Sequence, residues 1–224
     1  ESGTVWITYN GEIYNFLELR KALEKDGVRF RSHTDTEVVI YLYKKYGTEC
    51  LRHLRGMFAF AIWDKNTRQL FLARDRVGKK PLKYYHDRTT FIFASELKAI
   101  LTNREVKKEI DYEAIDEYLT YQYVPHPKTG FKNIYKLEPA HYLLVGEDGV
   151  VHKKRYWQLD FSHKLNLSEA EWEERIQSTL AESVRLRLVS DVPLGAHLSG
   201  GIDSSMVVAL MAQQQTKPIK TFSI

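Results

Sequence analysis

Two short segments of this 224-residue chain combine residue types that can carry out chemistry. The first is Leu198-Ser199-Gly200-Gly201-Ile202-Asp203-Ser204-Ser205, between a predicted strand and a predicted helix. Its small residues let backbone N–H groups approach a phosphate, and the N-terminus of the following helix adds partial positive charge. The segment matches neither a Walker A loop nor a dinucleotide-binding turn. It therefore predicts a phosphate site of another kind.

The second segment, Tyr9-Asn10-Gly11-Glu12-Ile13-Tyr14-Asn15, closely resembles the glutamine-site segment of class II glutamine amidotransferases, which are N-terminal nucleophile hydrolases. In that family a mature N-terminal Cys attacks glutamine, and an Asn side chain and a Gly amide stabilise the oxyanion. The resemblance assigns these two roles to Asn10 and Gly11, since both donors can point at a charge that appears only on reaction. It assigns Glu12 and Asp35 to the α-amino group of glutamine.

The first segment is similar to the pyrophosphate loop, Ser-Gly-Gly-x-Asp-Ser, of enzymes that adenylate a substrate and release pyrophosphate from ATP. The resemblance implies that the loop holds the phosphates of ATP and that Asp203 assists a magnesium ion. The ATP-binding residues expected on this basis are Leu198, Ser199, Gly200, Gly201, Asp203, Ser204, Ser205 and Ile224.

Simpler structural interpretations exist for the same residues. Asn10-Gly11 alone favours a hairpin turn, and Asp35 alone can be a first-turn acidic residue that the helix dipole favours. Ser199-Gly200-Gly201 can be a flexible turn, with Asp203 as a helix cap. The order of the motifs along the chain favours the functional interpretations over these structural ones, because it resembles that of asparagine synthetases over nearly the whole sequence. Those motifs are Asn10-Gly11-Glu12, Thr34-Asp35, Gly56 to Phe60, Arg74 to Leu82, Ala94 to Ala99 and the pyrophosphate loop.

The elements that must position the second segment, Tyr9 to Asn15, are predicted from periodicity. Val5 to Tyr9 is a β-rich run that Asn10-Gly11 breaks, and a helix follows from Phe16 to Lys25. Thr34 and Glu37 have the spacing of a capping box, at the start of a helix that ends at Gly47. Closely spaced β runs then predict an antiparallel meander. These runs are Met57 to Trp63, Gln69 to Ala73, Leu82 to His86 and Thr90 to Ala94.

A helix from Glu113 to Tyr121 and a hairpin from His141 to Trp157, turning at Asp148-Gly149, complete the first part. A second part begins after the polar stretch 159–167. Ser168 and Glu171 have capping-box spacing at the start of a helix that reaches about Leu188. A buried strand over 193–198, a helix over 203–215 and a strand over 219–224 follow. This βαβ order implies a parallel sheet.

The composition favours small-molecule chemistry in the cytoplasm. The net charge of +4 comes from 33 basic and 29 acidic residues, without the dense Lys/Arg blocks of a nucleic-acid or membrane-surface tract. No apolar run is long enough to cross a bilayer. Cys50 is the only cysteine, which excludes an intrachain disulfide and suits a reducing compartment, and its apolar surroundings predict a buried thiol. The eight His residues lack ligand spacing, so no zinc site is predicted.

Together the motifs predict a two-domain α/β protein. Residues 1–160 are expected to form an N-terminally truncated glutaminase domain, with the four-layer α-β-β-α sandwich of the N-terminal nucleophile hydrolases. Residues 161–224 are expected to open a C-terminally truncated, adenine-nucleotide α-hydrolase-like synthetase domain with a parallel sheet. By resemblance, glutamine hydrolysis supplies ammonia to β-aspartyl-AMP, which is made from aspartate and ATP, and the assembly could be a homodimer. Without the N-terminal Cys and most of the synthetase domain, the chain alone is expected to complete neither reaction.

Three other functions share these motifs. A β-lactam synthetase-like or peptide-cyclising relative would differ in its acceptor. A synthetase that uses free ammonia would carry a glutaminase domain without the Cys. A non-catalytic regulatory or scaffolding descendant would need neither segment, so the intact motifs argue against it. Arg74 and Asp75 are expected to hold a loop together, without a catalytic role.

Overall fold

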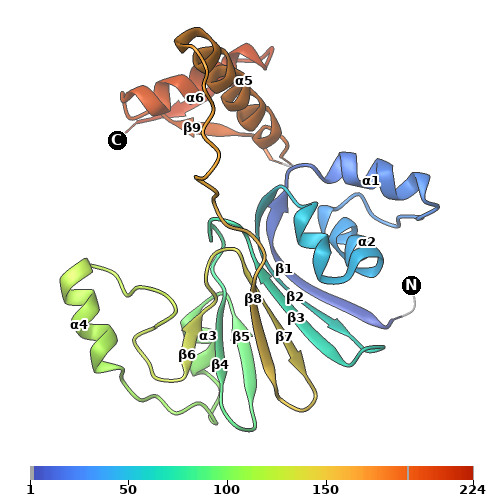
Figure 1. Ribbon diagram of the computed structural model, residues 1–224, viewed down its shortest axis with the longest axis vertical. Helices are drawn as coiled ribbons and strands as arrows, with labels where there is room; N and C mark the ends of the chain where they lie inside the picture. The colour runs from blue at the N-terminus through green and yellow to red at the C-terminus, as the bar shows by residue number, and fades with distance from the viewer. Residues whose placement is uncertain (1–2, 191, 224) are drawn as a thin grey trace. The chain divides into compact units, whose positions relative to one another are not determined.

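The computed structural model describes residues 3–190 and 192–223, which form two compact units (Figure 1). Unit 1 is Glu1–Leu159 and unit 2 is Asp160–Ile224. None of the helices in the described part of the chain combines the length and apolar content needed to cross a membrane.

Unit 1 contains two antiparallel sheets. The first has five strands in the order β1-β2-β3-β7-β8. Their bounds are β1 (Val5–Ile13), β2 (Gly56–Asp64), β3 (Gln69–Arg74), β7 (His141–Gly146) and β8 (Val151–Arg155). The predicted hairpin that turns at Asp148-Gly149 is confirmed, because β7 pairs antiparallel with β8.

The second sheet has three strands in the order β5-β4-β6. Its strands are β4 (Lys83–His86), β5 (Phe91–Ala94) and β6 (Ile134–Lys136). The prediction of a single meander is therefore wrong, since β2 and β3 pair in one sheet and β4 and β5 in the other. The connection over residues 75–82 carries the chain from the first sheet to the second.

Three buried cores separate four layers in unit 1. The helices α1 (Phe16–Lys25) and α2 (Asp35–Tyr46), with the short helix η1 (Gly47–Arg52), cover one face of the first sheet (Figure 1). Leu72, Tyr84 and Leu143 belong to the core between the two sheets. Tyr85 and Ile100 belong to the core between the second sheet and α3 (Leu97–Leu101). The α-β-β-α order expected from the resemblance is confirmed. A further helix of unit 1, α4 (Tyr112–Tyr121), follows α3 in the chain.

Unit 2 has the expected βαβ order. The strands β9 (Gly195–His197) and β10 (Lys220–Phe222) are parallel and flank α6 (Ile202–Gln213) in sequence. The predicted capping box is confirmed at the start of α5 (Glu169–Arg187), where the Ser168 N–H donates to the Glu171 carboxylate at 2.7 Å. The prediction that β9 is buried is wrong, because Gly195 and His197 are exposed in a sheet of two strands.

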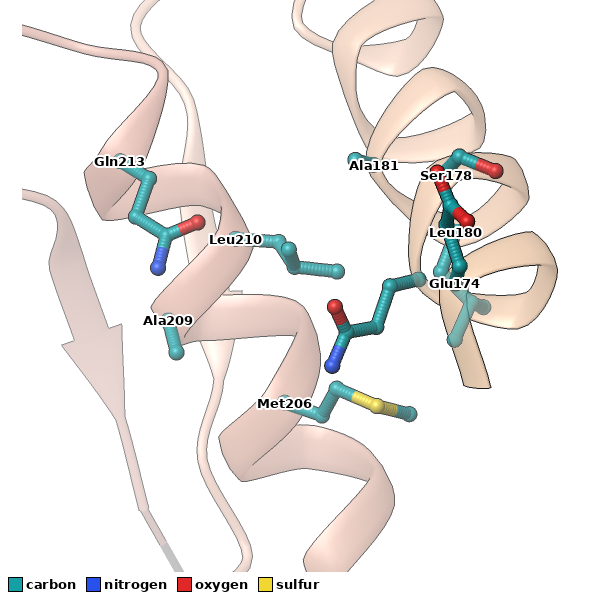
Figure 2. A pocket seen from close by; sticks show the side chains of 9 residues that line it. Glu174, Ser178, Leu180, Ala181, Met206, Ala209, Leu210 and Gln213 are labelled. Carbon is teal, nitrogen blue, oxygen red and sulfur yellow. The ribbon is translucent and has the colours of Figure 1, made fainter. Parts of the chain in front are cut away.

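The helices α5 and α6 face each other across an open, mostly apolar cavity of about 520 Å³ (Figure 2). Met206 and Leu210 of α6 point toward α5, which contributes Leu180 and Ala181 to the lining. Apolar side chains of both helices thus face this cavity, and residues 198–201, which precede α6, lie between the two helices in the sequence.

Candidate active sites

Asn10 and Gly11 lie inside β1 and do not form a turn. In the antiparallel register with β2, Asn10 is opposite Ala59 and Gly11 is opposite Phe58. The predicted break of the strand is therefore wrong, and the hairpin-turn interpretation is excluded. Pairing with β2 overrides the local preference of the Asn-Gly dipeptide for a turn.

Gly11 occupies a position where two backbones approach closely. A Cβ atom there would lie 2.4 Å from the Met57 carbonyl oxygen and 2.8 Å from the Phe58 Cα. These backbone atoms cannot move away while β1 and β2 stay paired. A glycine in a strand often marks such an approach, and any side chain at position 11 would displace the strand.

The backbone N–H groups of β1 point alternately toward β2 and toward the free edge of the sheet. The Tyr14 N–H donates to the Arg55 carbonyl at 2.8 Å, and the Lys65 N–H donates to the Thr4 carbonyl at 2.8 Å, so even-numbered residues bond across to β2. Because the direction of N–H groups alternates along a strand, the Gly11 N–H points away from β2. Since β1 is the outermost strand among the described residues, this N–H lies at an open edge.

Asp35, the first residue of α2, reaches the same edge. Its Oδ2 accepts hydrogen bonds from the Ile13 N–H at 2.9 Å and from the Tyr9 hydroxyl at 2.6 Å. Gly11 lies midway between these two residues on β1. The structure therefore brings Asp35 to the Asn10-Gly11-Glu12 segment, as the chemistry predicted for these residues requires.

Sequence reasoning missed Tyr9, which the structure makes the hydrogen-bonding partner of Asp35. Burial most strongly, then the hydrogen bond and charge of Asp35, and then the charge of Glu12 raise the pKa of the Tyr9 hydroxyl. The phenol therefore stays a neutral donor, with two carboxylates acting on it. In the sequence, Tyr9 comes one residue before Asn10. Because side chains alternate along a strand, this position puts the Tyr9 side chain on the opposite face from Asn10, which the helices cover, and this was the signal available in the sequence.

The Asn10 side chain lies on the face of the first sheet that meets the second sheet. Its Nδ2 donates to the Ser95 hydroxyl at 3.3 Å. A cavity of about 240 Å³ adjoins this contact, with Thr8, Leu82 and Phe93 among the residues that line it. The Asn10 amide is exposed, so it can reach a ligand at this end of the strand.

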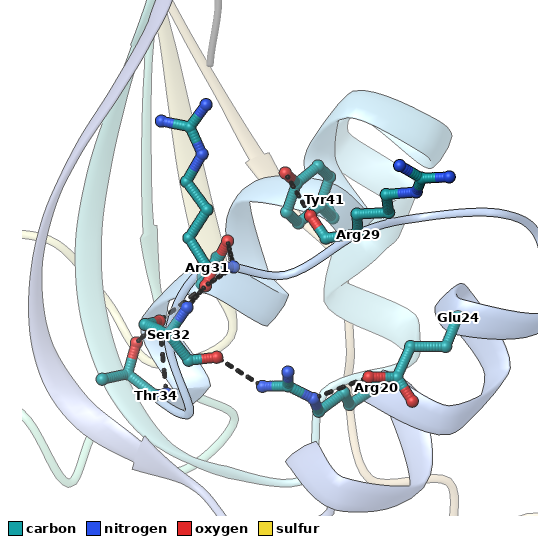
Figure 3. Close-up of polar contacts among 8 residues, drawn as sticks. Arg20, Glu24, Arg29, Arg31, Ser32, Thr34 and Tyr41 are labelled. Carbon is teal, nitrogen blue, oxygen red and sulfur yellow. Dashed lines mark hydrogen bonds and ion pairs between the residues drawn. The ribbon is translucent and has the colours of Figure 1, made fainter.

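The loop before α2 is fixed by charged side chains (Figure 3). The Glu37 carboxylate accepts hydrogen bonds from the Ser32 N–H at 2.7 Å and the Arg31 N–H at 2.9 Å. Arg20 donates from Nη1 to the Ser32 carbonyl at 2.6 Å. Burial alone would raise the pKa of Glu37, but the hydrogen bonds from Ser32 and Arg31 outweigh it and lower the pKa. The first turn of α2, which carries Asp35, therefore starts from a rigid loop.

These contacts correct the predicted capping box at Thr34. The Thr34 side chain makes no capping hydrogen bond to α2, and the Glu37 carboxylate bonds with Ser32 and Arg31 instead of the backbone of Thr34. The Ser32 hydroxyl also donates to Glu37, at 2.6 Å. The Thr-x-x-Glu spacing located the helix start but not the partner of the carboxylate.

Asp75 and Arg74 hold the connection over residues 75–82, as expected. Asp75 is fully buried, and Arg74 donates to the Lys80 carbonyl at 2.7 Å and the Gly78 carbonyl at 2.8 Å. The Asp75 carboxylate accepts four backbone N–H hydrogen bonds of 2.9–3.2 Å, from Phe58, Val77, Lys79 and Lys80. The loop is thereby tied to β2, next to the strand that carries Gly11.

Asp75→Ala should lower the free energy of unfolding of the chain by on the order of 3 kcal/mol, because it leaves several buried N–H groups without an acceptor. Asp148→Ala is the matched control, since Asp148 is exposed and accepts one backbone N–H hydrogen bond, from Val150 at 3.1 Å. It should cost less than about 1 kcal/mol. Urea unfolding measures both, and equal losses would contradict the anchoring role of Asp75.

The pyrophosphate-loop segment joins β9 to α6. Gly201 is the N-cap of α6, and Gly200 has a φ of 82°, which side-chain-bearing residues rarely adopt. The Ser199 and Ser204 hydroxyl oxygens lie 3.0 Å apart, and the Ser204 hydroxyl donates to the Gly201 carbonyl at 3.2 Å. The loop therefore closes over the first turn of the helix, where N–H groups are free of helical partners.

Asp203 lies in the first turn of α6 with its carboxylate exposed. The helix-cap interpretation of Asp203 is not supported, because Gly201 is the N-cap and Asp203 has no hydrogen bond or ion pair within residues 3–190 and 192–223. Leu198 donates its N–H to β10, and Ser205 is exposed on α6. Ile224, also expected to bind ATP, lies outside the described residues.

A magnesium ion fits this arrangement only if other oxygens complete its shell. Among the residues that the structure describes, no three His, Cys, Asp or Glu side chains cluster as metal ligands. Mg²⁺ is commonly held by one or two carboxylates together with substrate phosphates and water. The exposed Asp203 carboxylate, in the first turn of a helix that follows a glycine-containing loop, fits that pattern.

Cys50 is a buried thiol, as predicted. Its exposed fraction is 0%, and burial raises its pKa to about 12. The thiolate that a nucleophile requires is therefore scarce at neutral pH. Cys50 packs in the core between the helices and the first sheet.

Comparison with known proteins identifies the family. Residues 1–157, more than half of the chain, match the sequence profile of the glutamine amidotransferase domain. The chain belongs to this amidotransferase family. Its final residues, 175–224, match the profile of asparagine synthase.

The amidotransferase chain is similar to several named proteins. It is 40% identical over 224 residues to asparagine synthetase (glutamine-hydrolyzing) 1 of Bacillus subtilis, covering 100% of the chain and 35% of that protein. It is 37% identical over 215 residues to amidase chry2 of Gibberella zeae, covering 95% of the chain and 31% of that protein. The chain thus spans about a third of the length of these relatives. A solved glutamine phosphoribosylpyrophosphate amidotransferase from B. subtilis matches at 18% identity and a TM-score of 0.48, over 100% of this chain and 46% of that one.

Proposed function

We propose that the whole protein to which this chain belongs makes asparagine from aspartate, ATP and glutamine. Unit 1 would hydrolyse glutamine, and unit 2 would begin the domain that forms β-aspartyl-AMP and passes it to ammonia. The observation that carries the proposal is the open edge of β1: the Gly11 N–H points outward there, the Asp35 carboxylate binds the nearby Ile13 N–H, and the exposed Asn10 amide lies one residue away on the adjoining face. The names of the relatives support the choice of aspartate as acceptor.

In glutamine hydrolysis, the residues of unit 1 would divide into two roles. The Asn10 amide and the Gly11 N–H would donate to the oxyanion that forms on the substrate amide. Asp35 and Glu12 would bind the α-amino group, because the charges of both carboxylates act at this edge. The nucleophile would be an N-terminal Cys outside this chain, since burial disables Cys50.

In the synthetase reaction, the loop at residues 198–205 would hold the phosphates of ATP through backbone N–H groups and the hydroxyls of Ser199, Ser204 and Ser205. Asp203 would hold a magnesium ion, which offsets the charge of the phosphates when it is bound. Ile224 would contact ATP as well. Beyond these small molecules, we expect no nucleic-acid or membrane partner. We also expect the protein to be cytoplasmic and to form a homodimer.

Aspartate dependence tests the proposal. With ATP, magnesium and glutamine, the whole protein should release pyrophosphate only when aspartate is present, in amounts equal to the asparagine formed. Ammonium should replace glutamine, because the synthetase site uses ammonia from either source. Pyrophosphate release that ignores aspartate but responds to another carboxylic acid would assign the protein to a different acceptor.

A further inference from the structure

A second pocket of unit 1 has a basic wall that glutamine hydrolysis does not use. The pocket, with a volume of about 290 Å³, lies at the end of the second sheet. Arg74, Lys83 and Lys136 line it, together with His126 and Tyr123, and no Asp or Glu is among its lining residues. Leu82 is the lining residue that it shares with the cavity beside Asn10.

Strand pairing forces the two lysines together. Lys83 on β4 is directly opposite Lys136 on β6, so both side chains project from the same face of the sheet. Like charges at directly opposite positions are destabilising. The Lys83 Nζ donates to the Ser95 carbonyl at 2.7 Å and the Lys136 Nζ donates to the Val124 carbonyl, which leaves further N–H donors on each ammonium group.

Two carboxylates act on Arg74, but neither of them lines the pocket. The charges of Asp75 and Glu138 act on Arg74, but Asp75 is saturated by backbone N–H groups and Glu138 forms an ion pair with Lys153. Within the described residues, neither Lys83 nor Lys136 has an ion-pair partner. The positive charge of the pocket is therefore not compensated by a carboxylate of its own wall.

The pKa of Lys136 reports this imbalance. Burial lowers it most, and the charges of Lys83 and Arg74 lower it further. No carboxylate offsets these effects. A bound anion would reverse them, because an opposite charge within a few ångströms favours the ammonium form.

We propose that this pocket binds a phosphoryl group, either as free phosphate or as part of a small phosphate ester. A dianion with several acceptor oxygens can bridge two ammonium groups that line the same pocket, whereas a single carboxylate would offset only one charge. Lysine binds phosphate as a point charge, without the planar geometry that arginine imposes. Tyr123 and Pro81 provide a less polar wall against which the remainder of an ester could pack. The volume suits a small metabolite.

Titration of the chain with inorganic phosphate at constant ionic strength tests this site, with backbone amide NMR shifts as the readout. We expect saturable shifts at Lys83, Tyr84 and Lys136, with a Kd on the order of 1 mM. Lys83→Met and Lys136→Met should each weaken binding at least tenfold. Lys108→Met is the control for lost charge, because Lys108 is exposed and outside the pocket, and it should change the Kd less than twofold.

Titrations with glycerol 3-phosphate and with acetate distinguish the possible ligands. Tighter binding of glycerol 3-phosphate than of phosphate would assign the site to esters, and the reverse to the free ion. Acetate binding as tight as phosphate would overturn the assignment of a phosphoryl group. Equal weakening by all three lysine variants, or shifts confined to residues 198–205, would overturn the site itself. None of these outcomes depends on glutamine hydrolysis.

Discussion

Asp203→Asn should lower the rate of aspartate-dependent pyrophosphate release by the whole protein on the order of 100-fold or more, with glutamine or with ammonium. Such a loss corresponds to about 2.7 kcal/mol. ATP brings several negative charges, and cleavage of its α-β bond places more charge on the departing pyrophosphate. An exposed carboxylate beside the loop would repel this charge unless a cation lay between them. The amide of Asn keeps the size of the side chain and removes the charge that such a cation needs.

Glu169→Gln is the matched control for Asp203→Asn. Glu169 is also an exposed acidic residue in the first turn of a helix in unit 2. Loss of its charge should cost only the helix-dipole contribution, about 0.3–1 kcal/mol of stability, and leave synthesis close to wild type. Glutamine hydrolysis should persist in both variants. Near-normal synthesis by Asp203→Asn at ordinary magnesium concentrations would contradict the metal role.

Local signals in the sequence predicted the elements whose partners are close in the chain. The Ser168–Glu171 capping box formed because both partners lie within one helical turn. The hairpin of β7 and β8 formed because Asp148-Gly149 suits a turn between two β runs. The same reasoning failed at Thr34, where Glu37 found donors in the preceding loop, at Ser32 and Arg31.

Long-range pairing determined what the sequence could not show. Asn10-Gly11 has the composition of a turn, yet β2, more than forty residues later, holds it as a strand. The open edge at Gly11 depends on the whole strand order, in which β7 pairs with β3 and leaves β1 outermost among the described residues. Likewise, Lys83 and Lys136 are unremarkable in sequence and become neighbours only through the pairing of β4 with β6. Motif order indicated the family, but not this geometry.

Asn10→Ala should lower the kcat of glutamine hydrolysis by the whole protein roughly 100-fold, a cost of about 3 kcal/mol, because one donor to the oxyanion is lost. The donor acts mainly once charge develops, so KM should change little. Thr8→Ala is the matched control. Thr8 lies two residues away on the same face of β1 and lines the same cavity, so its loss should change kcat less than about twofold.

Asp35→Asn should instead raise KM about tenfold or more and leave kcat closer to wild type. The Asn oxygen can still accept from the Tyr9 hydroxyl and the Ile13 N–H, so the edge of β1 should keep its geometry while the charge is lost. A charge-assisted hydrogen bond to an ammonium group contributes about 1.5–3 kcal/mol, to bound substrate and transition state alike. Steady-state kinetics separate the two variants. If both lower kcat equally without changing KM, then Asp35 does not bind the ammonium group, and the division of the edge into oxyanion donors and an ammonium site is wrong.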